Sequence, residues 1–123
     1  MEERHGSLAV VAVSLDCADH DELAGFYAAL LDGSIVWRTG AAAAVRVGGY
    51  VLIAQRVDPY VKPVWPGASI VHLDLSGPDL DLEDQAAFAI AHGATVADVQ
   101  PDPRWVVMLD PAGHPFCLTP FTP

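Results

Sequence analysis

The chain has little positive charge. Lys and Arg number only 6 among its 123 residues, against 16 Asp and Glu, so its formal net charge is −10. A surface of this kind repels nucleic-acid phosphates and anionic lipids, and no cluster of Lys or Arg offsets the acidic balance. The sequence therefore predicts a protein that binds neither nucleic acid nor membranes.

Cysteine and long apolar runs are also scarce. The two cysteines, Cys17 and Cys117, match no zinc-binding or redox spacing, and a chain that is 52% hydrophobic does not need a disulfide between them. No apolar stretch approaches the roughly 20 residues that span a bilayer, and the acidic start MEERHGSLAVVAVSL lacks the basic region of a signal peptide. We therefore expect a cytoplasmic protein with a substantial core.

What the sequence does contain is an internal repeat with a period of about 60 residues, a feature that decides the fold wherever it occurs. The segment VAVSLDCADHDELAGFYAALLDGSIV (11–36) aligns without a gap with VHLDLSGPDLDLEDQAAFAIAHGATV (71–96). Each half contains an alternating strand, an acidic turn, a helix and a glycine, in that order. The linker RVDPYVKPVWPGAS between the halves is rich in proline, as a module boundary should be.

Each half predicts one helix and four strands. The expected helices cover 21–31 and 82–91. The expected strands cover 8–15, 35–38, 43–47 and 50–55, and then 69–75, 95–99, 104–109 and 115–119. Asp19 and Asp79 are the predicted N-caps, and Gly33 and Gly93 are the predicted left-handed residues after the helix ends. The predicted inward-facing helix residues are Leu23, Phe26, Tyr27, Leu30, Phe88 and Ile90.

This pattern predicts an α+β fold of two βαβββ modules that form a cup-shaped mixed sheet. We expect one domain over 1–123, with module one at about 7–57, the linker at 58–68 and module two at about 69–121. Each helix covers one face of its sheet, which leaves the other face free to build a pocket.

Strand alternation then assigns side chains to the two faces. The residues predicted to face the helices are Val11, Val13, Leu15, Val71, Leu73, Leu75, Phe116 and Leu118. The residues predicted to face the pocket in the second half are His72, Asp74, Cys117 and Thr119. Cys117 is accordingly expected to line a cavity rather than the packed core.

Three stretches, AVSLDCADHDELAGFYAALLDG, HLDL and DPAGHPFCL, resemble the glyoxalase/bleomycin-resistance/extradiol-dioxygenase (vicinal oxygen chelate) superfamily over essentially the whole chain. The resemblance implies paired βαβββ modules, commonly completed in a homodimer. It also implies four metal-ligand points, which fall here on Ala12, about Ile53, His72 and Cys117. Alanine and isoleucine cannot bind a metal, so two donors remain, with Asp74 as a conceivable third.

The small number of candidate metal-binding residues favours a protein that binds a small molecule without catalysis. The first hypothesis is a metal-independent, cofactor-free protein that sequesters an apolar or aromatic small molecule, as antibiotic-resistance proteins do. The alternative is a metal-dependent lyase, isomerase or dioxygenase that uses His72 and Cys117, a pair of donors that favours zinc or copper.

Aromatic residues in irregular segments are the other candidates for the pocket, because a linker tryptophan between prolines has little regular structure to pack into. The candidate ligand-binding residues are Trp37, Gln55, Tyr60, Trp65, His72, Asp74, Trp105, Cys117 and Thr119. No catalytic or metal-binding residue is assigned.

Overall fold

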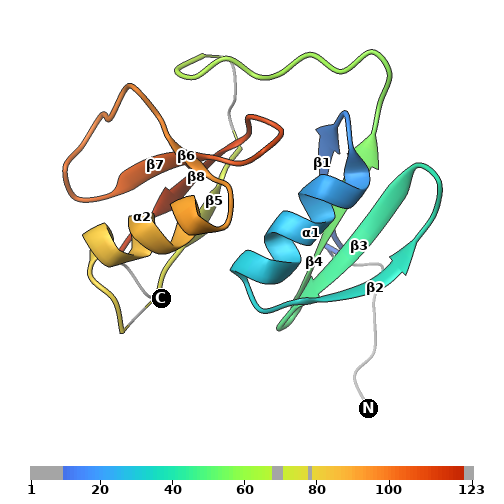
Figure 1. The fold of residues 1–123 in the computed structure, drawn as a ribbon, viewed down its shortest axis with the longest axis horizontal. Coiled ribbons are helices and arrows are strands. Elements are labelled where there is room, and N and C mark those ends of the chain that lie inside the picture. The colour runs from blue at the N-terminus through green and yellow to red at the C-terminus, as the bar shows by residue number, and fades with distance from the viewer. Residues whose placement is uncertain (1–9, 68–70, 78, 121–123) are drawn as a thin grey trace, which may run out of the picture.

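The structure, a computed structural model, describes residues 10–67, 71–77 and 79–120 and contains two similar modules (Figure 1). Module one contains β1 (Val13–Cys17), α1 (His20–Leu30), β2 (Ser34–Arg38), β3 (Ala42–Val47) and β4 (Tyr50–Arg56). Module two contains β5 (Leu73–Leu75), α2 (Leu82–Ala91), β6 (Thr95–Val96), β7 (Val106–Leu109) and β8 (Pro115–Leu118). The predicted α+β class and the βαβββ order of each module are confirmed.

Each module has its own four-stranded mixed sheet, and the two sheets have the same topology. The strand orders are β1-β4-β3-β2 and β5-β8-β7-β6, with the first pair parallel and the others antiparallel. Val13 pairs with Leu52 in module one, as Leu73 pairs with Phe116 in module two. This shared register makes Ile53 the structural counterpart of Cys117, in agreement with the ligand points that the superfamily resemblance implies.

The two modules share one hydrophobic core. Phe26 and Tyr27 of α1 lie with their ring centroids 6.1 and 6.4 Å from that of Phe116 in β8. Phe116 is fully buried, and burial of a side chain of this size contributes about 3 kcal/mol. The predicted helix-facing side of β8 is therefore confirmed, and it holds the modules against each other.

A turn after β7 fastens the modules by hydrogen bonds as well. The Tyr27 hydroxyl donates to the buried Asp110 carboxylate (2.7 Å), which also accepts from the backbone N–H groups of Ala112 and His114 (both 2.9 Å). Burial raises the pKa of Asp110, and these hydrogen bonds oppose that rise. The His114 ring adds a contact from Nε2 to the backbone oxygen of Asp16 (2.6 Å).

The helix ends show two corrections to the sequence-based expectations. Asp19 caps α1 as expected, but α2 is capped by Asp81 rather than Asp79, because Asp81 directly precedes the first helical residue and accepts from the backbone N–H of Asp84 (2.8 Å). Gly93 takes the left-handed conformation (φ 111°), whereas Asp32 takes it after α1 (φ 52°). Gly33 is required for space instead, since a Cβ there would lie 2.8 Å from the backbone oxygen of Arg46.

The inward face of α2 was predicted wrongly. Phe88 and Ile90 are 45% and 50% exposed, while Gln85 and Ala89 are buried. Leu82, which also packs against the core, lies on the same helical face as these two buried residues. The prediction placed the large apolar residues Phe88 and Ile90 in the core. The residues that face the core are instead those that follow the helical spacing from Leu82.

The first strand of each module starts later than predicted. Val11 and Val71, which were expected to face the helices, precede β1 and β5 and are exposed. Residues 8–9 and 69–70 of the predicted strands lie outside the described residues. In the described part of the chain, no helix has the length and apolarity to cross a membrane.

Candidate functional site

A pocket of about 410 Å³ lies on the face of the second sheet that is turned away from the shared core. Its volume falls in the range of ligand-binding cavities, about 300–1,000 Å³. The residues that line it come from the linker, β5 and the residue before it, the β6–β7 connection, β7, and β8 with the residue after it. They are Trp65, His72, Asp74, Pro101, Trp105, Val107, Cys117 and Thr119.

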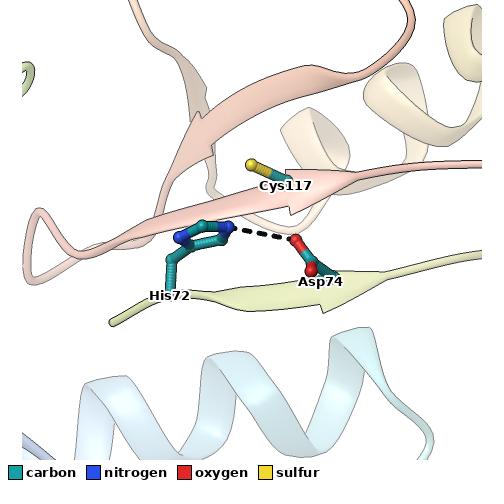
Figure 2. A group of neighbouring side chains, drawn as sticks. All are labelled: His72, Asp74 and Cys117. Carbon is teal, nitrogen blue, oxygen red and sulfur yellow. Dashed lines mark ion pairs between the residues drawn. The ribbon is translucent and has the colours of Figure 1, made fainter. Parts of the chain in front are cut away.

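Three polar side chains meet on one wall of this pocket (Figure 2). Asp74 lies in β5 opposite Cys117 in β8, and His72 lies just before β5 on the same side of the sheet. His72 Nε2 is 3.1 Å from Asp74 Oδ1, and one potential ligand atom from each of the three residues lies within 4.8 Å of the others. The strand alternation predicted this grouping because residues of one parity share a face.

Cys117 forms the floor of the pocket as a protonated thiol. It is buried and packs with Ala97 and Val107, and both tryptophans of the site contact this small cluster. Burial, together with the charge of Asp74, raises the pKa of the Cys117 thiol. A thiol in these surroundings is a poor nucleophile at neutral pH, because only the thiolate attacks.

The tryptophan walls are held in place by their neighbours. Trp65 Nε1 donates to the backbone oxygen of Val99 (3.0 Å), which fixes the linker against the β6–β7 connection. The guanidinium of Arg104 lies 5.3 Å from the centroid of the Trp105 ring, a cation–π distance. Arg104 is also bound through two nitrogens to Asp102 (2.9 and 2.8 Å), and this pairing lowers the pKa of Asp102 to about 2.

Gln100 gives the β6–β7 connection its shape. Its side-chain nitrogen donates to the backbone oxygens of Ala97 and Val107 (2.9 and 2.8 Å), and its oxygen accepts from the N–H of Val107 (2.8 Å). These bonds replace ladder hydrogen bonds where β6 has ended. They hold Pro101 and Trp105 at the rim of the pocket.

Six of the nine candidate ligand-binding residues line this pocket: Trp65, His72, Asp74, Trp105, Cys117 and Thr119. The other three lie elsewhere. Trp37 is on the open face of the first sheet, opposite Ala44, and Gln55 is half-buried in β4. Tyr60 donates to the backbone oxygen of Ala112 (2.7 Å) beside a small separate hollow.

Sequence reasoning missed Pro101 and Val107 as lining residues and Gln100 as the residue that shapes the rim. Val107 has the parity of Cys117, its partner in the β7–β8 pairing, so the alternation rule applied to β7 would have found it. Pro101 and Gln100 belong to an irregular connection, for which periodicity gives no signal.

The donor set fits a divalent metal ion of the softer kind. His72 Nε2, an Asp74 oxygen and the Cys117 sulfur are donors of the types that zinc binds, and the side toward the pocket would remain open to a further ligand. The equivalent positions of module one, Ala12 and Ile53, provide no donor. A metal bound here would rest on one module alone.

Paired βαβββ modules with a pocket on one open sheet face define the vicinal oxygen chelate class of proteins. The chain belongs, more narrowly, to the glyoxalase-like domain family, whose model matches residues 12–119. The search of curated proteins gave no significant match.

Solved structures with the same fold are similar to this chain at low sequence identity. The fosfomycin resistance protein FosX from Listeria monocytogenes, complexed with Mn(II) and 1S,2S-dihydroxypropylphosphonic acid, has a TM-score of 0.70 at 13% identity, covering 93% of this chain and 90% of that chain. FosX from Mesorhizobium loti has a TM-score of 0.68 at 16% identity, covering 93% and 92%. A glyoxalase family protein from Enterococcus faecalis has a TM-score of 0.68 at 18% identity, covering 89% and 95%.

Proposed function

We propose that this protein binds and sequesters an apolar or aromatic small molecule without the help of a metal. The observation that carries the proposal is the pocket of about 410 Å³ with two tryptophan walls and a floor of Cys117 and Val107. Flat aromatic walls with a few polar groups are typical of binding sites, in which stacking supplies most of the affinity.

Two further facts support sequestration over catalysis. Two of the four ligand points of the superfamily carry alanine and isoleucine, and the Cys117 thiol is disfavoured as a nucleophile. The fosfomycin resistance proteins among the structural neighbours make defence against a toxic small molecule the biological setting that we propose.

Equilibrium titration tests the proposal. Coumarin, flavone and berberine differ in size and charge, and we expect at least one of them to quench tryptophan fluorescence saturably, since Trp65 and Trp105 line the pocket. The bound compound should be recovered unchanged by chromatography after prolonged incubation. Conversion of the compound, or the lack of saturable binding across a wider aromatic panel, would count against sequestration.

One observation favours a second candidate, a metal-dependent lyase, isomerase or dioxygenase. The ligand atoms of His72, Asp74 and Cys117 already lie within 4.8 Å of one another beside the pocket. Bound there, a metal would act as a Lewis acid on a substrate oxygen. His72 and Asp74 would hold the metal in place, and the tryptophans would exclude water from the reacting groups.

Elemental analysis separates the two candidates. For protein purified without chelator, our first proposal predicts metal well below one ion per chain, unchanged by His72→Ala. The second candidate predicts about one zinc or similar ion per chain, lost in His72→Ala and retained in the control His92→Ala, which lies at the end of α2. The second pattern would replace sequestration by metal-dependent chemistry as the function.

A further inference from the structure

We propose that the pocket selects aromatic guests that carry a positive charge, with an ammonium or amidinium group against the Asp74 carboxylate and the ring against the tryptophans. This inference rests on the proposed function and names the class of ligand. Its basis is the charge and geometry of the lining residues.

The residues that line the pocket carry negative charge and no formal positive charge. Of the residues that line the pocket, Asp74 is the only one with a formal charge when histidine is counted as neutral, and no Lys or Arg is among them. The whole chain adds to this field with its net charge of −10. A cationic guest is drawn toward such a pocket, whereas an anionic guest meets repulsion with no cation to offset it.

The Asp74 carboxylate is available to a guest. Its side chain is 62% exposed on the pocket wall, and only its Oδ1 faces His72 Nε2. Within the part of the chain that the structure describes, Oδ2 has no hydrogen-bond donor.

The aromatic wall suits a cation as well. The face of an indole ring attracts cations, and the guanidinium of Arg104 lies 5.3 Å from the centroid of the Trp105 ring. Arg104 does not line the pocket, and its guanidinium is paired with Asp102 through Nε and Nη2. A ring and a carboxylate in one pocket are complementary to the two halves of a cationic aromatic molecule.

Three probes with one ring system test the inference: naphthylmethylamine, naphthylmethanol and naphthoate, which are cationic, neutral and anionic. Calorimetric titration should give an affinity for the amine about 5-fold above that for the alcohol, a modest ratio because solvent screens a carboxylate that is more than half exposed. The affinity for naphthoate should be lower than for both.

The variant Asp74→Asn should reduce the affinity for the amine about 5-fold, to the level of the alcohol, and should improve naphthoate binding. The control Glu83→Gln removes an equal charge from the first turn of α2, outside the pocket, and should preserve the amine preference. Circular dichroism verifies that both variants are folded.

Each outcome has one meaning. If the native protein binds the alcohol as tightly as the amine, or if Asp74→Asn leaves the amine preference intact, the charge selection is wrong while sequestration stands. If no naphthyl probe binds although the protein binds a compound of the aromatic panel, the inferred ligand class is wrong; if nothing in either set binds, the proposed function itself fails.

Discussion

Replacing Asp110 by alanine is expected to lower the free energy of unfolding by about 3 kcal/mol or more, the largest stability effect that we foresee. The carboxylate accepts hydrogen bonds from the Tyr27 hydroxyl and from the N–H groups of Ala112 and His114. Alanine leaves these donors without their acceptor in a buried site, and each unsatisfied group costs about 1–3 kcal/mol. Thermal unfolding should shift down by roughly 10 °C or more.

Two further variants test the predicted loss of stability. Asp110→Asn keeps an oxygen for the two backbone donors and should be less destabilising than Asp110→Ala. Asp98→Ala, at an exposed bend, should change the melting temperature little. Equal melting temperatures for Asp110→Ala and Asp98→Ala would mean that the Tyr27–Asp110 contact does not fasten the two modules.

Loss of both pocket tryptophans is expected to weaken guest binding more than 100-fold. A central, well-packed tryptophan commonly contributes about 2 kcal/mol or more to binding, a factor of roughly 30, and the two in this pocket face the same guest. A double variant with Trp65→Ala and Trp105→Ala lacks both tryptophan walls of the pocket, while the core around Phe116 stays intact. Equilibrium dialysis with the tightest-binding compound from the titration measures the effect without relying on tryptophan fluorescence.

Trp37→Ala is the matched control for this experiment. Trp37 is 45% exposed on the open face of the first sheet and does not line the pocket. Its removal should leave affinity unchanged. A comparable loss of affinity in Trp37→Ala would place the binding surface on the first sheet and contradict the proposed site.

The sequence predicted those parts of the fold that depend on periodicity. The repeat gave the order of the elements in both modules, and strand parity placed His72, Asp74 and Cys117 on one wall. The cap of α1 was found because Asp19 directly precedes the helix. These features follow from local geometry, which a pattern of residues encodes directly.

The features that sequence reasoning missed depend on the exact ends of the elements and on the space available between them. Asp79 was selected as the cap because it aligns with Asp19, although Asp81 directly precedes the predicted and observed start of α2 at Leu82. Phe88 was expected to be buried because of its size, but the space beside the sheet accommodates Ala89. The role of Gln100 depends on where β6 ends, which no residue of the strand itself determines.

The β2–β3 connection of module one is short, whereas its counterpart in module two is long and helps to form the pocket. Residues 39–41 join β2 to β3, whereas 97–105 join β6 to β7 and contribute Pro101 and Trp105 to the rim. The guest preference that we propose can therefore be altered at this connection, because Pro101 and Trp105 belong to it and the shared core around Phe116 does not. Shortening that segment to the length found in the first half would remove this rim and leave a shallower sheet face.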